Sequence, residues 1–148
     1  MNVILIAAIT LDGYIARKND EVITWSKDLK LFKEQTMGCP VIMGSNTYKT
    51  LAVDLEGRDC IIVHKNDDPV EVLSKVKTEK CFVIGGGMTN TKFVKQLTHL
   101  YVTPHPILFG GGIKLFTNMD IEINLKLIAT VPVDEEIGIF QQQYVVVR

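Results

Sequence analysis

Residues 28–51 read DLKLFKEQTMGCPVIMGSNTYKTL, and this stretch predicts a helix, a strand and a second helix in succession. Ser26 is suited to cap the first helix, which we expect to run to about Met37, where a glycine and then a proline end it. Val41–Met43 is a short apolar run, typical of a buried strand. The glycine after it precedes Ser45, Asn46 and Thr47, which are good caps for a short helix through Leu51.

The same alternation of strands and helices continues on both sides of this stretch. It predicts a mostly parallel, twisted sheet with helices on both faces, because parallel strands need crossover connections. Residues 122–133 and 139–147 have no helix between them and predict an antiparallel C-terminal edge. The expected fold class is therefore α/β, with residues 1–148 as a single domain. The other expected elements are strands at Val3–Ile9, Cys60–Val63, Cys81–Ile84 and Leu100–Thr103, helices from Val70 to about Lys77 and from the glycine triplet to about Leu97, and an irregular loop from Pro104 to Gly112.

The composition is that of an ordinary globular chain. Of 148 residues, 47% are hydrophobic and 22% are charged, and the formal net charge is −1. Such a balance argues against nucleic acid or an anionic membrane as the main partner. No stretch approaches the ~20 apolar residues of a membrane span. The three cysteines have no metal-type spacing, so we expect reduced thiols in a cytoplasmic protein and no metal site.

Two strand-to-helix turns have the composition of phosphate-binding turns. One is VIGGG, Val83 to Gly87, in which three glycines allow close backbone approach and the next helix offers free N–H groups. The other is VIMGSNT, Val41 to Thr47, in which one glycine precedes polar side chains. A single glycine triplet is equally compatible with an ordinary tight turn. Two such turns after strands of one sheet favour a ligand at the carboxyl ends of the strands. The spacing is not G-x-G-x-x-G, so the standard dinucleotide fingerprint is absent.

His64 and Lys65 follow a predicted strand and have two interpretations. They meet an additional phosphate on a cofactor ribose, or they are ordinary polar surface residues.

Asp28 is the residue of the opening stretch that most needs an explanation. It shares a helix face with Leu31 and Phe32, so a carboxylate lies at the margin of an apolar stripe. One interpretation is an acid of the first helical turn, which the helix dipole favours. The other is a partly buried carboxylate that binds, or helps to protonate, a nitrogen heterocycle. Thr103, at a strand end, either hydrogen-bonds this acid and the substrate or is an ordinary surface threonine.

The residues from Asp28 to Leu51 closely resemble the helix-strand-helix segment of dihydrofolate reductases. Four further segments match that family in the right order, and together they cover roughly the first 103 residues of the chain. They are LIAAITLDGYIA (Leu5 to Ala16), GRDCIIV (Gly57 to Val63), VIGGG, and LYVT (Leu100 to Thr103).

The resemblance implies NADPH-dependent reduction of dihydrofolate to tetrahydrofolate, with a role for each matching position. Asp28 corresponds to the acid that holds the pterin and aids its protonation, Thr103 bonds that acid, and Trp25 borders the pocket through a water. Arg58 clamps the carboxylate of the glutamate tail. The implied walls of the substrate pocket are Ile6, Ala7, Ala8, Leu29, Phe32, Leu51 and Ile84. The implied cofactor-binding residues are Ala8, Ile15, Gly44, Ser45, Asn46, Thr47, Val63, His64, Lys65, Gly85, Gly86, Gly87 and Met88.

The chain also departs from that family's pattern. Ser45 stands where the family has a basic residue for the cofactor phosphates, and Asn90 stands where it has a tyrosine. Only two residues separate Trp25 from Asp28, and the family's Leu-Pro is missing there.

Residues 104–116, PHPILFGGGIKLF, resemble a different group, the reductase domain of riboflavin biosynthesis. Those enzymes share the fold and NADPH but reduce a ribosylaminopyrimidine phosphate. The alternatives are therefore a pyrimidine or other pteridine reductase of the same superfamily, or a non-catalytic nucleotide-binding protein. The sequence is compatible with a monomer and with a homodimer.

Overall fold

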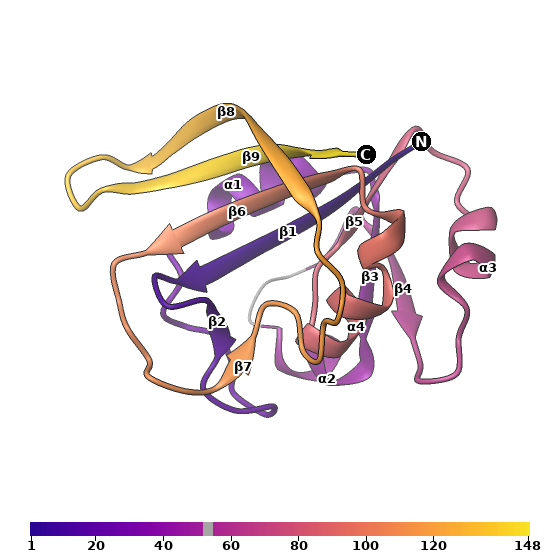
Figure 1. The fold of residues 1–148 in the computed structure, drawn as a ribbon, viewed down its shortest axis with the longest axis horizontal. Coiled ribbons are helices and arrows are strands. Elements are labelled where there is room, and N and C mark those ends of the chain that lie inside the picture. The colour runs from indigo at the N-terminus through magenta and orange to yellow at the C-terminus, as the bar shows by residue number, and fades with distance from the viewer. Residues whose placement is uncertain (52–54) are drawn as a thin grey trace.

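The computed structural model describes residues 1–51 and 55–148, and its main feature is a seven-stranded sheet (Figure 1). The order of the strands across this sheet is β4-β3-β5-β1-β6-β9-β8. Their bounds are β1 Asn2–Thr10, β3 Pro40–Gly44, β4 Asp59–Val63, β5 Lys80–Val83, β6 His99–His105, β8 Asn124–Asp134 and β9 Ile139–Val147.

The pairing of the strands confirms the predicted fold class. The pairs β4–β3, β3–β5, β5–β1 and β1–β6 are all parallel, whereas β6–β9 and β9–β8 are antiparallel. The carboxyl ends of five parallel strands therefore meet along one edge of the sheet, and ligands of such sheets bind at that edge.

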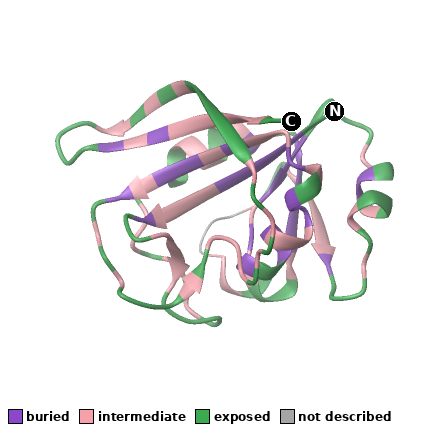
Figure 2. Ribbon diagram, in the orientation of Figure 1, coloured by how far each residue is buried: buried purple, intermediate pink, exposed green. Residues whose placement is uncertain are grey.

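Helices cover both faces of the sheet. On one face α1 (Leu29–Thr36) places Phe32 against a core cluster that includes Ile6, Met43 and Phe82. On the other face the core cluster is filled from α3, from the segment after α4 and from the sheet itself. Figure 2 shows the buried residues gathered along the central strands, while β8 at the edge is exposed and half-buried. The remaining helices are α2 Ser45–Thr50, α3 Pro69–Ser74, α4 Gly87–Lys92 and the 3-10 turn η1 Val94–Gln96.

The predicted helix caps are wrong. Helix α1 begins at Leu29, three residues after Ser26, and its N-cap is Asp28, whose side chain makes no capping hydrogen bond. Helix α2 begins at Ser45 and its N-cap is Gly44, again with no side-chain cap. Both starts are set by the strand or loop that precedes them, and packing of the helix outweighs the small free energy of one cap.

Helices α3 and α4 are shorter than predicted. Helix α3 is capped by Asp68, whose carboxylate accepts from Val70 N at 3.0 Å, and it ends where Val76 N bonds the carbonyl of Leu73 at 3.1 Å in a tighter turn. The predicted helix to Leu97 is broken in the same way after α4, and η1 follows.

Two features of the chain between residues 11 and 114 were not predicted. Strand β6 continues through Pro104 to His105. Its pairing with β9 ends at Val102, so the missing N–H of Pro104 costs no hydrogen bond to β9. The short strands β2 (Tyr14–Ala16) and β7 (Ile113–Lys114) pair as a separate antiparallel sheet.

No helix of the described chain has the length and hydropathy to cross a membrane.

Candidate active site

A cavity of about 720 Å³ lies along the carboxyl ends of the parallel strands. Its wall is built from the ends of β1, β3, β4 and β5, the starts of α1, α2 and α4, and the segment between β1 and α1. Twenty of the residues proposed from the sequence line it: Ile6, Ala7, Ala8, Ile15, Asp28, Leu29, Phe32, Gly44, Ser45, Asn46, Thr47, Leu51, Val63, His64, Lys65, Ile84, Gly85, Gly86, Gly87 and Met88. The fold therefore brings together most of the site expected from the sequence.

Asp28 lies at the start of α1 and lines the cavity, with 7% of its surface exposed. Burial raises the pKa of its carboxyl above the ordinary value, while a positive charge on His105, when that ring is protonated, and the Thr103 hydroxyl act to lower that pKa. Among the described residues, no lysine or arginine forms an ion pair with Asp28. A carboxyl group in this setting stays protonated to a higher pH than one in water, so it can donate a proton or hold a protonated ring.

Thr103 and Trp25 are placed behind this acid and do not line the cavity. Thr103 is fully buried on β6, and its hydroxyl acts on the pKa of Asp28. Its geometry falls short of an ordinary hydrogen bond, so Thr103 Oγ1 is left without a partner among the described residues. The indole Nε1 of Trp25 is likewise buried without a partner there. Unpaired buried polar atoms are costly, so these two groups suit a polar ligand or a bridging water.

The two glycine turns predicted from the sequence lie side by side. Gly44 N donates to the carbonyl of Gly85 at 2.9 Å, which extends the β3–β5 pairing to the tips of both strands. The backbone at Gly44 leaves little space for a side chain, because a Cβ atom there would lie 2.9 Å from the Thr89 hydroxyl. A Cβ atom at Gly86 would make only an ordinary contact with the Thr47 hydroxyl, at 3.5 Å. The Gly85–Gly86 peptide is cis. A surface of bare backbone and threonine hydroxyls fits the phosphates of a dinucleotide.

His64 and Lys65 lie at the rim of this part of the cavity and are exposed. The turn that carries them is braced by Lys92, whose Nζ donates to the carbonyls of Lys65 and Asp67, each at 2.7 Å. Asp67 in turn accepts from His64 N at 2.8 Å. The structure thus places a lysine and a histidine side chain on a fixed turn beside the glycine turns.

Arg58 lies outside the lining of the cavity, next to α1. Its guanidinium donates from Nε to Thr36 Oγ1 at 3.0 Å, from Nη2 to the carbonyl of Lys33 at 3.0 Å, and from Nη1 to the carbonyl of Glu56 at 2.7 Å. These bonds tie the start of β4 to the end of α1 and fix the direction of the guanidinium.

The segment from Leu11 to Lys27 lies over the cavity, and most of its lining residues carry no sequence pattern that predicts this position. It contributes several lining residues that matched no pattern, among them Lys18, Glu21 and Ser26. The segment rests on residues 105–115, where Asp12 accepts from the backbone N–H of Phe109 at 3.2 Å and of Gly110 at 2.8 Å. The LDG sequence at its start is a signal for a turn, but not for what the turn contacts.

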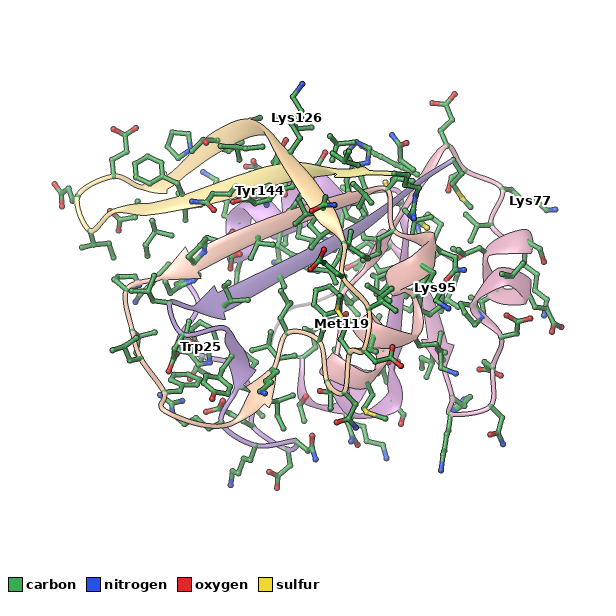
Figure 3. The ribbon with its side chains drawn as sticks, in the orientation of Figure 1. Trp25, Lys77, Lys95, Met119, Lys126 and Tyr144 are labelled. Carbon is green, nitrogen blue, oxygen red and sulfur yellow. The ribbon has the colours of Figure 1, made fainter. Side chains whose placement is uncertain are left out.

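Residues 105–115 hold this segment by side chains as well. The Arg17 guanidinium lies 4.3 Å from the centre of the Phe109 ring, and Trp25 meets the same ring edge-on at 5.3 Å. Figure 3 shows Trp25 beyond the carboxyl ends of β1 and β6, on the side of β2 and β7. The PHPILFGGG sequence therefore packs against the segment that lies over the cavity and supports it.

The chain matches known proteins along most of its length. The family model described as dihydrofolate reductase matches residues 2–120. Dihydrofolate reductase type 3 from Salmonella typhimurium is 31% identical over 117 residues, which cover 70% of this chain and 71% of that protein. Dihydrofolate reductase from Bacillus subtilis (strain 168) is 30% identical over 139 residues, which cover 84% of this chain and 80% of that protein.

Two solved structures show the same fold. Dihydrofolate reductase from Enterococcus faecalis, complexed with NADP(H) and RAB-propyl, gives a TM-score of 0.76 at 20% identity, over 99% of this chain and 97% of that one. A putative riboflavin biosynthesis protein from Shewanella sp. PV-4 gives a TM-score of 0.67 at 22% identity, over 100% of each chain. These structures establish the architecture, whereas the family model and the two relatives establish the descent. The chain belongs to the dihydrofolate reductase family, a family of oxidoreductases.

Proposed function

We propose that this protein reduces 7,8-dihydrofolate to tetrahydrofolate with NADPH. The observation that carries the proposal is Asp28, a buried carboxyl group with a raised pKa on the wall of a cavity that also holds two glycine turns. An acid is needed because reduction of the pterin adds a proton to a ring nitrogen as well as a hydride to carbon. The proposal assigns the proton side of the reaction to Asp28.

The residues at the glycine turns fit a nicotinamide dinucleotide. Gly44, Gly86 and Thr47 would hold the pyrophosphate, and His64 and Lys65 would meet the ribose phosphate that distinguishes NADPH from NADH. When bound, NADPH supplies the hydride. The protein's own residues orient the two rings, exclude water and set the charge around them.

The apolar walls contributed by β1 and α1 fit the flat heterocycle. Ala7, Leu29 and Phe32 line the same cavity as Asp28. Burial of the acid raises its pKa, and these apolar walls leave the ring nitrogen and amino group of a pterin to pair with the carboxyl. In this arrangement Thr103 supports the acid from behind, and Arg58 at the end of α1 would meet the glutamate tail.

A second function is favoured by one observation, the likeness of residues 104–116 and of the whole fold to riboflavin-type reductases. Such an enzyme must bind a ribose phosphate on its substrate. Among the described lining residues, β1 and α1 supply no cation. The cations of the cavity come from the segment before α1, the turn after β4 and helix α4. Dihydrofolate is therefore the better fit beside Asp28.

The test is NADPH oxidation by the purified wild-type protein with three substrates in parallel. These are dihydrofolate, an unconjugated dihydropterin and a ribosylaminopyrimidine phosphate. Turnover of dihydrofolate, at a kcat/KM above that of the other two, is the expected result. Turnover of the pyrimidine alone would overturn the proposal in favour of the second function, and NADPH binding without any turnover would leave a nucleotide-binding protein.

A further inference from the structure

His105 is a buried titratable side chain that the proposed mechanism does not use. It is the last residue of β6, with 3% of its surface exposed, and it does not line the cavity. It belongs to the PHPILF sequence, residues 104–109, for which the sequence predicted only an irregular loop. Its position directly behind the segment that carries Asp28 raises the question of what it holds.

Both ring nitrogens of His105 have backbone partners. Nδ1 lies 2.9 Å from the carbonyl oxygen of Thr103, and a carbonyl only accepts, so Nδ1 carries a proton. The backbone N–H of Lys27 donates to Nε2 at 2.9 Å, so Nε2 carries no proton. The two bonds together assign one neutral tautomer to His105.

These bonds connect β6 to the residue just before Asp28. Lys27 and His105 are 78 positions apart in the chain, and their hydrogen bond joins the end of the sheet to the start of α1. On the other side, the carbonyl of Asp28 accepts from Phe32 N at 2.9 Å in the first helical turn. The backbone around Asp28 is thus held from both directions, by His105 through Lys27 and by α1.

The ring of His105 also anchors Trp25 in the same segment. The two rings meet edge-on, with centroids 5.3 Å apart and an interplanar angle of 88°. The chain between Trp25 and Asp28 is only two residues long, so a support placed at Lys27 fixes the whole of it.

We propose that His105 is a positioning residue that sets the place of the Asp28 carboxyl, acting as a neutral acceptor for the backbone of Lys27. The inference deepens the proposed function and rests on it for the role of the acid.

The alternative is that His105 acts on Asp28 by charge. A cationic His105 lowers the pKa of Asp28, but the second proton has to go on Nε2 and would displace the Lys27 bond. The titratable groups around His105 are few. Asp28 faces it from the segment before α1. On β1 its register partner is Thr10, whose hydroxyl is bonded to Asp12. A positioning role and a charge effect predict opposite changes in the pKa of Asp28 when the imidazole is removed. Measuring that pKa therefore separates the two interpretations.

Two variants form a matched pair. His105→Gln keeps a side-chain acceptor within reach of Lys27 N, where Nε2 now lies. His105→Asn keeps a donor to the carbonyl of Thr103 but is too short to reach Lys27. The first readout needs no turnover. NMR of the labelled protein gives the tautomer of His105 in the wild type, and the titration of the Asp28 carboxyl carbon in the wild type and both variants.

For a positioning residue we expect Nδ1 to be protonated in the wild type. We also expect a lower Asp28 pKa in His105→Asn, because the loosened segment admits water, and a wild-type pKa in His105→Gln. A rise of the Asp28 pKa in both variants, or a protonated Nε2 in the wild type, would overturn the proposal.

The second readout is kinetic. His105→Asn should lower kcat by between about ten- and a hundredfold with NADPH affinity unchanged, as a small displacement of a reacting group does, and His105→Gln should recover most of that loss. Equal losses in both variants would count against the proposal. If the wild type reduces no dihydrofolate, the proposed function fails while the tautomer and the Asp28 titration still decide the role of His105. Thermal melts and NADPH titrations of each variant exclude a general loss of fold.

Discussion

At the scale of single residues, the account depends on a carboxyl group that the protein buries at a cost to its own stability. Asp28 is the N-cap of α1 but makes no capping bond, so its burial is not explained by helix capping. Its carboxyl has no ion-pair partner in the described part of the chain, and burial raises its pKa. Residues kept in such surroundings are typical of functional sites.

The raised pKa predicts how Asp28→Asn changes stability with pH. Because the folded-state pKa lies above the unfolded value, the contribution of Asp28 to stability is complete below the unfolded value and is lost as the pH rises through the folded one. Asp28→Asn should therefore be more stable than the wild type at neutral pH and equal to it in acid. A gain on the order of 1 kcal/mol would raise Tm by about 2–4 °C in a chain of this size.

Thermal melts of both proteins from pH 3 to 8, in the range set by the carboxyl groups, measure this difference. Asp120→Asn, which neutralises an exposed acid outside the cavity lining, is the control and should show no such trend. A difference between Asp28→Asn and wild type that shrinks as the pH rises would contradict the assignment.

Arg58 supports a prediction that separates the two ends of the substrate. Its guanidinium is already directed by Thr36 and Lys33, as a fixed clamp for a carboxylate has to be. Arg58→Leu should raise the KM for dihydrofolate by about 10- to 100-fold, the range of a charge-assisted hydrogen bond. The KM for an unconjugated dihydropterin should stay nearly unchanged. An equal rise for both substrates would show that Arg58 only supports the fold, and a thermal melt of the variant measures that contribution.

At the scale of elements, the segment over the cavity is held in place by β2, β7 and the glycines beside them. A Cβ atom at Gly112 would lie 2.3 Å from the carbonyl oxygen of Ala16, and the φ of Gly112 is +136°. Gly111, its neighbour, has no atom within 4 Å of such a Cβ and no positive φ. The two positions form a natural pair for testing the contact.

Gly112→Ala should destabilise the fold by about 1–3 kcal/mol, because the new side chain strains the backbone and separates β7 from β2. Gly111→Ala should change the free energy of unfolding by no more than about 0.5 kcal/mol. Urea denaturation gives both values, and NADPH titration shows whether the cavity changes with the contact. Equal stabilities of the two variants would mean that this packing is not required.

The elements also show what the sequence predicts well and what it does not. The ends of every predicted strand of the main sheet lie within one or two residues of the observed ones, because apolar runs bounded by turn residues identify buried strands. Ser26 and Ser45 were predicted as caps from their side chains, but the N-caps are Asp28 and Gly44, because tertiary packing sets where the two helices begin. Strands β2 and β7 have three and two residues, too few for a period to be visible.

The residues of the candidate site also divide into those that a local sequence pattern identifies and those that it does not. Asp28 and the glycine turns were found because their neighbours in the chain carry a pattern. His105 had no such local signal, because its hydrogen bond joins it to Lys27, 78 positions away in the chain.

At the scale of the whole molecule, we propose that residues 1–148 form a single domain. The first strand β1 lies in the middle of the main sheet, and the last strand β9 pairs with its neighbour β6. The two ends of the chain are therefore held by one sheet and should unfold together.

This proposal predicts one cooperative transition with two probes. Trp25 is the chain's one tryptophan and reports on the segment over the cavity, whereas far-ultraviolet circular dichroism reports on the sheet and helices. The two signals should change at the same denaturant concentration. A tryptophan transition that comes first would show that the segment unfolds separately and that its contacts with residues 105–115 are weak.

The most direct test of the central claim, that Asp28 is the acid of dihydrofolate reduction, is the single-turnover rate of NADPH oxidation with saturating dihydrofolate, measured across pH for the wild type and Asp28→Asn. A raised pKa keeps the acid protonated to higher pH, so the wild-type rate should be greatest in acid and fall as the pH rises through that pKa. Asp28→Asn should be slower by about a hundredfold or more, with no such fall, and should bind NADPH as the wild type does. An Asp28→Asn rate that matches the wild type in size and pH dependence would contradict the account.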